Sequence, residues 1–148
     1  MYGLNFASWY LGKEVADLFA CCEAFHGIDS HTTVLMKYAD GSIATISSAT
    51  MLRTPNEGAV YGTKGYAKLE HFYAPEKLEL FYADGSTETI ETPYEGNGFE
   101  EQIRHVCSCI SAGLTESPIN THEQTRFITR QMDEIRRKIG IVYPQDKD

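Results

Sequence analysis

The segment Tyr38-Ala-Asp-Gly-Ser42 recurs unchanged as Tyr82-Ala-Asp-Gly-Ser86, and each copy lies between two stretches of alternating apolar residues. Asp-Gly at the centre of such a segment is typical of a β-hairpin turn, because glycine adopts positive φ without steric cost. Nothing else in the chain repeats at this spacing. The two copies therefore predict two hairpins of antiparallel strands, and not a solenoid of stacked repeats.

Further strands are expected on both sides of the first hairpin. Gly62-Thr-Lys-Gly65 is a turn signal between two more apolar segments. Residues 15–25 are apolar on both faces, and we interpret them as a long strand near the centre of the sheet, with a helix as the alternative that periodicity alone leaves open. These segments together predict about seven strands.

Helical patterns flank the strands. Residues 2–11 form an apolar helical stretch that stops at Gly12, and Asn97-x-x-Glu100 and Thr121-x-x-Gln124 are capping-box patterns that each precede an amphipathic segment. The expected apolar positions of these two later helices are Phe99, Ile103, Val106, Ile110, Phe127, Ile128, Met132, Ile135 and Ile139. We predict an α+β fold: a predominantly antiparallel open sheet of about seven strands with helices packed on one face. The other face then needs a partner chain or a further domain to cover it.

Composition narrows the class of protein. The 148 residues include 13 Lys and Arg and 21 Asp and Glu, a net charge of −8, which argues against nucleic acid or an anionic membrane as the main partner. No apolar run approaches the roughly 20 residues of a membrane span, and the first residues lack the basic region of a secretory signal. We expect a single soluble domain over residues 1–148, located in the cytoplasm.

Few residues suggest chemistry by themselves. The cysteines occur as Cys21-Cys22 and Cys107-x-Cys109 and lack the C-x-x-C spacing. We expect them to be reduced and buried as small hydrophobic residues, with cross-pairing of the two clusters as the alternative. The chain contains no Walker loop or G-x-G-x-x-G to hold a phosphate, and no nucleophile elbow. It also lacks H-E-x-x-H and any other paired metal-ligand spacing, so we expect no metal site. From its residues alone, the chain reads as a binding or assembly domain without a complete active site.

Several segments resemble one family in order and spacing. Tyr2-Gly-Leu-Asn-Phe-Ala with Trp9-Tyr-Leu-Gly12 resembles the part of the Gfo/Idh/MocA oxidoreductases in which Asp-x-Gly-x-Tyr-x-Leu continues into a helix ending Leu-Gly. The other matching segments are Gly27-Ile-Asp29, Asp40-Gly41, Gly62-Thr-Lys-Gly65, Gly98–Val106, Gly113–Pro118, Met132–Arg136, Ile139-Gly140 and Tyr143-Pro144. The ending is similar to that of dihydrodiol dehydrogenases, the branch that includes NADP-dependent D-xylose dehydrogenases.

The resemblance implies the C-terminal substrate-binding and oligomerisation domain of an NAD(P)-dependent oxidoreductase that oxidises a sugar or diol carbinol by hydride transfer. In the family, NAD or NADP is bound by an N-terminal Rossmann domain, and a Glu-Lys-Pro motif supplies the catalytic lysine. Residues 1–148 contain neither, so we expect the isolated chain to bind no NAD(P) and to be inactive. A non-catalytic assembly domain with a vestigial pocket is the alternative. We also expect a homo-oligomer, most simply a dimer, formed through the open sheet face.

The resemblance also implies site residues. Tyr2 matches the tyrosine or histidine beside the substrate carbinol and is the candidate catalytic residue. Tyr73, in His71-Phe-Tyr-Ala-Pro75, and Tyr94, in the loop before Gly98, match aromatic residues of the substrate pocket and are the candidate substrate-binding residues.

Other matched positions are expected to be structural. We interpret Asn97 as a helix cap, and His105 and Asp29 as structural residues. Cys22 and Glu23 stand where the branch often has arginines, a departure that affects which charged substrate groups the chain could recognise.

Overall fold

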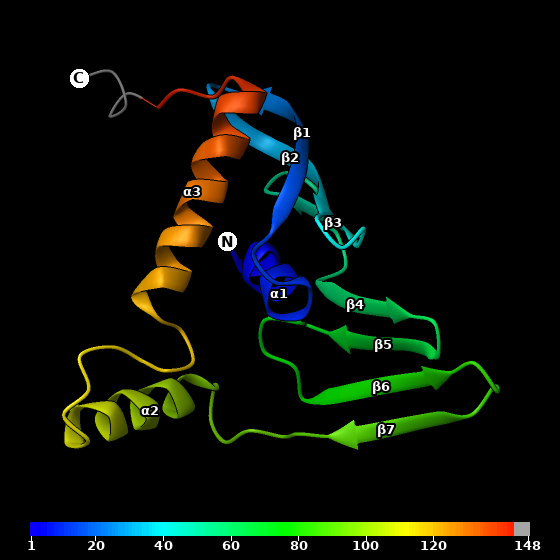
Figure 1. Cartoon of the computed structure of the whole chain (residues 1–148), viewed down its shortest axis with the longest axis vertical. Coiled ribbons are helices and arrows are strands. Elements are labelled where there is room, and N and C mark those ends of the chain that lie inside the picture. Colours follow the sequence, from blue (N-terminus) through cyan, green and yellow to red (C-terminus); the bar gives the residue numbers. More distant parts are fainter. Residues whose placement is uncertain (144–148) are drawn as a thin grey trace. The chain divides into compact units, whose positions relative to one another are not determined.

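A computed structural model describes residues 1–143, and its helices and strands are labelled in Figure 1. The helices are α1 (Tyr2–Leu11), α2 (Phe99–Ser111) and α3 (His122–Ile139). The strands are β1 (Val15–Phe25), β2 (Ile28–Tyr38), β3 (Ile43–Ala49), β4 (Glu57–Gly62), β5 (Gly65–Glu70), β6 (Lys77–Tyr82) and β7 (Thr87–Glu91). The chain forms two compact units, residues 1–54 with 123 onward, and residues 55–122. The matched ending at Tyr143-Pro144 extends into residues 144–148, outside the described residues.

The repeated pentapeptide forms the same turn twice. Asp40 Oδ1 accepts a hydrogen bond from the Ser42 amide at 2.9 Å, and Asp84 Oδ1 accepts one from the Ser86 amide at 2.8 Å. The amide of Ser42 lowers the pKa of Asp40, and the Ser86 hydroxyl, which donates to Asp84 Oδ1 at 2.6 Å, lowers the pKa of Asp84 together with the Ser86 amide. The central glycines have φ values of 90° and 87°, which explains why glycine is needed there. Both predicted hairpins, β2–β3 and β6–β7, are confirmed.

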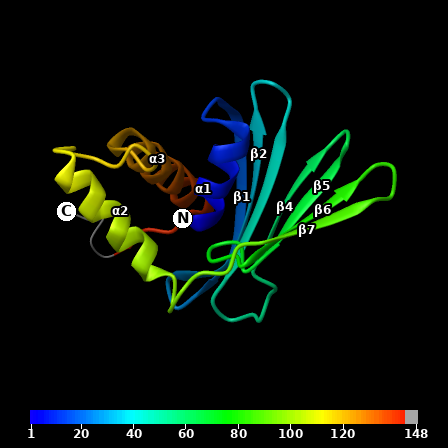
Figure 2. The same cartoon turned by 90° about the horizontal axis from the view of Figure 1, so that it is seen from below.

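The first unit is a three-stranded antiparallel sheet, in the order β1-β2-β3, with α1 and α3 on one face. Figure 2 shows both helices on the same side of β1 and β2. The strand register places Leu18 opposite Met36, and Met36 opposite Ala44, so small and large apolar side chains alternate across the helix-covered face.

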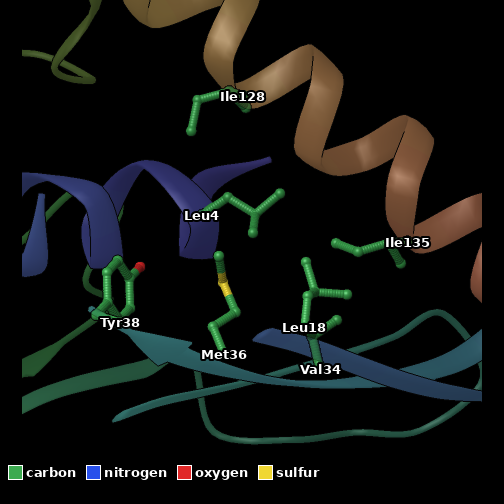
Figure 3. Packing of buried hydrophobic residues seen from close by; sticks show 7 residues of the cluster. All are labelled: Leu4, Leu18, Val34, Met36, Tyr38, Ile128 and Ile135. Carbon is green, nitrogen blue, oxygen red and sulfur yellow. The ribbon is translucent and has the colours of Figure 1, made fainter. Parts of the chain in front are cut away.

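The core lies between this face and the two helices. Its buried members are Leu4, Leu18, Val34, Met36, Tyr38, Ile128 and Ile135, shown in Figure 3. Met36 and Tyr38 are 1% and 2% exposed. Ile128 and Ile135 come from the predicted apolar stripe of α3, whereas Met132 from the same stripe is exposed. Burial of these side chains is the main interaction that holds α1 and α3 on the sheet.

The opposite face of this sheet is open in the described chain. Because side chains alternate along a strand, Phe19, Leu35 and Ile43 point away from the helices. They are 62%, 42% and 64% exposed. The prediction of helices on one face is therefore correct for β1–β3.

The second unit contains a four-stranded antiparallel sheet, β4-β5-β6-β7. Tyr61 pairs with Tyr66, and Tyr66 with Phe81, so three aromatic rings line one face. The rings of Tyr66 and Phe81 are stacked with centroids 4.5 Å apart. Tyr61 is 78% exposed, so this face also has a large apolar surface open to solvent.

Two predictions about the strands are wrong. The seven described strands form sheets of three and four strands, not one sheet of seven. Residues 50–56, which separate β3 from β4, are too long for a tight turn and include Pro55, which has no N–H for a ladder. Strand β1 has its predicted bounds but lies at the edge of its sheet, because β2 pairs with both β1 and β3.

Helix α2 also differs from the prediction. It begins at Phe99 after Gly98, and Asn97 Oδ1 accepts a hydrogen bond from the Phe99 amide at 3.1 Å. The Asn97 side chain therefore accepts a hydrogen bond from the first amide of the helix, although Gly98 and not Asn97 is the N-cap residue. Its predicted core positions Phe99, Ile103, Val106 and Ile110 are 53–69% exposed.

The cysteines are free, but they are not the buried residues that the sequence predicted. Cys21 and Cys107 are exposed, while Cys22 and Cys109 are half-buried. Cys21 and Cys107 lie on element faces that no other described element covers, which periodicity alone does not reveal. None of the helices in residues 1–143 is both long enough and apolar enough to cross a membrane.

We predict that Tyr38→Phe leaves the free energy of unfolding unchanged or raises it. The Tyr38 hydroxyl is buried and has no hydrogen-bond partner among the described residues, and an unpaired buried polar group costs about 1–3 kcal/mol. Met36→Ala is the matched control in the same core and should cost about 2–5 kcal/mol. Urea denaturation followed by circular dichroism measures both.

The same variant has a signature at alkaline pH. Burial raises the pKa of Tyr38 in the folded state, whereas an unfolded tyrosine ionises near pH 10. The folded state thus holds this proton more tightly, so stability present below pH 10 is lost as the pH rises through the raised pKa. The wild-type chain should lose more stability above pH 10 than Tyr38→Phe does. Equal losses would show that folding does not raise the pKa of Tyr38, and a destabilised Phe variant at pH 7 would show that the hydroxyl has a partner.

Candidate functional site

A small buried group of polar side chains fixes α1 against α3. Gln124 Nε2 donates to Ser8 Oγ at 2.6 Å and to Asn5 Oδ1 at 3.0 Å, and Ser8 Oγ donates to the Asn5 carbonyl oxygen at 2.9 Å. Ser8 and Gln124 are 8% and 6% exposed. Because buried hydrogen bonds require definite geometry, this group sets the rotation of α1 about its axis.

Tyr2 is the first residue of α1 and its side chain is 63% exposed. Helical spacing places it on one face with Phe6 and Trp9, away from the buried Leu4 and Ala7. The core and the Gln124 hydrogen bonds therefore hold the Tyr2 backbone in place while its phenol remains open to solvent. A rigid backbone with an accessible hydroxyl is a suitable position for a group that meets a substrate.

Asn5 is a second residue of interest on the same helix. In the family phrase Asp-x-Gly-x-Tyr, the tyrosine lies two residues after the glycine, and two residues after Gly3 this chain has Asn5. The Asn5 amide is half-buried and accepts the hydrogen bond from Gln124. Where the family phrase has a tyrosine, this chain therefore has the amide side chain of Asn5. The tyrosine of this segment is Tyr2, three residues earlier on the same helix.

Tyr73 lies in the connection between β5 and β6, in the second unit. Its ring makes edge contacts with His71 and Phe72, with centroids 6.5 Å and 6.1 Å away. His71 has a φ of 48°, and its carbonyl accepts a hydrogen bond from the Ala74 amide at 2.7 Å. This tight turn presents the Tyr73 side chain outward, 51% exposed.

Tyr94 is half-buried in the loop before α2. A Cβ on Gly98 would lie 3.3 Å from the Tyr94 ring, so the ring rests against the backbone at the start of the helix. Gly98 has a φ of 83°, which favours glycine. Tyr94 and Tyr73 belong to the second unit and Tyr2 to the first, so the structure defines each of the three only within its own unit.

The N-termini of α2 and α3 do not suit a dinucleotide. A pyrophosphate binds at a helix N-terminus free of negative charge, after a glycine-rich turn from a parallel strand. Here all paired strands are antiparallel. The first turn of α2 carries Glu100 and Glu101, and at α3 the Glu116 carboxylate already accepts the His122 amide at 2.6 Å. Negative charge at these ends opposes phosphate.

Metal chemistry has no obvious site either. In the described part of the chain, no three His, Cys, Asp or Glu side chains come together to hold a metal ion.

A shallow hollow of about 400 Å³ lies at the turn between β4 and β5. Its apolar lining includes Val60, Ala67 and Leu80, and Lys64 is its one charged residue. A Cβ on Gly65 would overlap the Phe81 carbonyl oxygen, so the close approach of β5 and β6 here requires glycine. The hollow contains none of the three predicted tyrosines and no acid–base pair.

The two positions expected to be structural do make structural contacts. Asp29 accepts hydrogen bonds from Thr32 Oγ1 and from the Tyr143 hydroxyl, both at 3.1 Å, which fastens the segment after α3 to β2. His105 Nε2 lies 2.7 Å from Ser117 Oγ.

The buried polar group Asn5–Ser8–Gln124 was not predicted from the sequence. A signal for it exists, because Ser8 lies four residues after the core residue Leu4, and Gln124 four residues before the core residue Ile128. Polar residues in register with an apolar stripe on two different helices indicate a buried hydrogen bond between them.

Comparison with known proteins shows what the chain is similar to. The model of the GFO/IDH/MocA C-terminal domain matches residues 1–68. The trans-1,2-dihydrobenzene-1,2-diol dehydrogenase of Mus musculus is 26% identical over 157 residues, which covers 99% of this chain and 46% of that protein. The enzyme of the same name from Oryctolagus cuniculus is 29% identical over 133 residues, with 82% and 39% covered. The chain spans about half the length of the curated relatives it matches.

Solved structures share the fold. The UDP-N-acetylglucosamine 3-dehydrogenase of Acidithiobacillus ferrooxidans superposes with a TM-score of 0.78 at 16% identity, over 92% of this chain and 44% of that one. An aldose-aldose oxidoreductase from Caulobacter crescentus, complexed with glycerol, gives 0.77 at 22% identity, over 93% and 42%. A 3-ketoreductase from Actinomadura kijaniata in complex with NADP gives 0.75 at 16% identity, over 93% and 45%.

These solved structures belong to the Gfo/Idh/MocA oxidoreductases, and the curated relatives are dehydrogenases. The match over residues 1–68, the aligned relatives and the common fold taken together make the chain similar to the GFO/IDH/MocA C-terminal domain family.

Proposed function

We propose that this chain is the substrate-binding half of an NAD(P)-dependent oxidoreductase that acts on the carbinol of a diol or sugar. The observation that carries the proposal is the alignment of 99% of the chain with one half of a trans-1,2-dihydrobenzene-1,2-diol dehydrogenase. The similar structures include enzymes named for sugar nucleotides and aldoses, which supports a polyhydroxylated substrate. The similarity to the GFO/IDH/MocA C-terminal domain and the shared fold do not depend on this finer assignment.

NAD or NADP would accept the hydride from the carbinol carbon, and the acidic helix ends described above argue that another polypeptide segment holds it. We expect the isolated chain to be inactive for that reason. The role of this chain is then to bind and orient the carbinol and to move its hydroxyl proton.

Tyr2 is the residue we assign to the proton. Oxidation of a carbinol needs a group within hydrogen-bond reach of its oxygen, and the Tyr2 phenol is exposed on a helix that the core holds rigid. A tyrosine with a pKa near 10 is a poor base at neutral pH unless a cation stabilises its phenolate. The catalytic lysine expected from the family would supply that cation.

Tyr73 and Tyr94 would line the substrate pocket. Both present aromatic surface from short, tightly turned segments, and aromatic faces pack well against the apolar faces of diol and sugar rings. Our assignment of these two residues rests on the family resemblance and on their partial exposure.

The test of the proposal is a fusion protein. The cofactor-binding half of the mouse dihydrodiol dehydrogenase, joined ahead of residue 1, should reduce NADP in the presence of trans-1,2-dihydrobenzene-1,2-diol or D-xylose, with NADPH absorbance as the readout. A folded fusion that binds NADP but oxidises neither would favour the alternative, a non-catalytic assembly domain.

We predict that Tyr2→Phe in the active fusion lowers kcat by about 10²–10⁴-fold, because a positioned proton-transfer group contributes that much. Cofactor affinity should be nearly unchanged, since the ring remains. Tyr10→Phe is the matched control, because Tyr10 lies on the same helix and is 56% exposed. Near-normal kcat in the Tyr2 variant would make it a packing residue and would direct attention to Asn5.

We also propose that the chain is a homo-oligomer, most simply a dimer through an open sheet face. In the described residues, both sheets have one face with large exposed apolar side chains, Phe19 and Ile43 in one and Tyr61 and Tyr66 in the other. Apolar surface of this extent usually marks an interface, and two-fold pairing is the commonest way to close it.

Light scattering should therefore give about twice the chain mass of 16.6 kDa. Tyr61→Asp should shift the mass to that of a monomer, because a charge on this face would be buried in the interface. Met51→Asp serves as the control, since Met51 is 65% exposed outside the sheets. A wild-type monomer across a dilution series would contradict the proposal.

We place the protein in the cytoplasm. Four free cysteines suit a reducing compartment.

A further inference from the structure

An asparagine followed directly by a glycine lies in the loop before α2. Asn97 and Gly98 are the one Asn-Gly pair of the sequence, since Asn5 is followed by phenylalanine, Asn56 by glutamate and Asn120 by threonine. The Asn97 side chain is exposed. Asparagine is among the chemically labile residues of proteins, and its lability depends on the residue that follows it.

Glycine at the following position favours loss of the asparagine amide. The reaction begins when the backbone nitrogen of the next residue attacks the side-chain carbon Cγ, and a Cβ on that residue would hinder the approach. Gly98 has no Cβ. Its N–H makes a long hydrogen bond, 3.4 Å, to the Glu95 carbonyl oxygen, which holds the nitrogen only weakly.

The turn before α2 directs the Asn97 side chain toward this nitrogen. Asn97 Oδ1 accepts a hydrogen bond from the Phe99 amide at 3.1 Å, so the side chain curls back over the peptide that joins residues 97 and 98. The same N–H is placed to stabilise the negative charge that develops on Oδ1 during the attack. The Glu95 carboxylate opposes that charge, but it is paired with Arg104 at 3.5 Å.

We propose that Asn97 is a site of spontaneous deamidation in the folded chain, with isoaspartate as the main product. The Gly98 nitrogen bonds to Asn97 Cγ, the Cγ–Nδ2 bond breaks, and ammonia leaves with the proton from the Gly98 nitrogen. Water then opens the resulting succinimide ring. Opening at one carbonyl carbon gives aspartate, and opening at the other gives isoaspartate, in which the main chain passes through the former side chain. The site does not depend on the proposed oxidoreductase activity.

The isoaspartate product loosens the start of α2. An extra main-chain carbon then separates the two residues, and the oxygen that accepted the Phe99 amide becomes a main-chain carbonyl oxygen that no longer turns back onto it. The Tyr94 ring lies against the Gly98 backbone, so a displaced Gly98 also changes the surroundings of Tyr94. The aspartate product keeps the acceptor oxygen, because only its amide nitrogen has been replaced.

The chain carries its own controls for the experiment. Asn56 and Asn120 are exposed like Asn97, so they separate the effect of exposure from that of the following glycine. The four asparagines lie in four different tryptic peptides. The folded chain is aged at mildly alkaline pH, and mass spectrometry follows the replacement of NH₂ by OH in each peptide. We expect Asn97 to deamidate at least about tenfold faster than Asn56 or Asn120, because no Cβ hinders the attack there.

Asn97→Ser tests the product. Serine keeps an oxygen that can accept the Phe99 amide but has no side-chain amide to lose. Protein isoaspartate methyltransferase should label the aged wild-type chain in the peptide that contains residue 97, and should leave the aged variant unlabelled. Hydrogen exchange of the Phe99 amide should become faster as the wild-type chain ages and stay unchanged in the variant.

Circular dichroism before ageing shows that both chains are folded. A rate at Asn97 equal to or below the rates at Asn56 and Asn120 would overturn the proposal. An aged wild-type chain that has lost the Asn97 amide without forming isoaspartate, or whose Phe99 amide exchanges as before, would contradict the product and its effect on α2.

Discussion

The packing of α1 and α3 onto one face of β1–β3 is the interaction on which the rest of the first unit depends. Met36 and Tyr38 are almost completely buried between the sheet and the helices, and the Gln124 side chain bridges the two helices through Ser8 and Asn5. The apolar contacts provide the stabilisation, and the buried hydrogen bonds fix the orientation. The exposed pair Lys13–Glu123, 2.9 Å apart, lowers the pKa of Glu123 but contributes little to stability, because such pairs are screened by water.

This arrangement separates structural surfaces from surfaces available for function. One side of α1 is buried and the other presents Tyr2, Phe6 and Trp9, so the candidate catalytic phenol stands on a fixed helix. The sheet β1–β3 is covered on one face and leaves the other open, and the sheet β4–β7 also has exposed aromatic side chains. A chain that spans about half the length of its relatives and exposes such surfaces is suited to association with further protein. The proposed binding of partners and the proposed positioning of the substrate would both follow from this one packing arrangement.

The sequence predicted local structure better than long-range structure. The repeated Tyr-Ala-Asp-Gly-Ser segments predicted both hairpins, and residues 2–11 and 15–25 became a helix and a strand with those bounds. Turn chemistry and periodicity act over a few residues, so such features can be read directly. Whether β3 pairs with β4 depends on the conformation of residues 50–56, which have no hydrophobic periodicity from which to predict it. The strands before and after this segment belong to separate sheets. The predicted burial of the cysteines and of the apolar stripe of α2 was also wrong, because periodicity shows which residues share a face but not what covers it.

For the candidate site, the sequence predicted where the three tyrosines lie along the chain's helices and loops. The Asn5–Ser8–Gln124 group and the contact of His105 with Ser117 could be found only from the coordinates.

The central proposal is that this chain binds the substrate and that another segment binds the dinucleotide. Titration calorimetry with NADP measures it most directly, with the 148-residue chain on its own compared with the fusion that carries a cofactor-binding half. We predict no saturable heat for the chain, because the N-termini of α2 and α3 carry carboxylates and the paired strands of the described residues are antiparallel, and clear saturation for the fusion. Saturable binding of NADP by the chain on its own, at micromolar concentrations, would contradict this account.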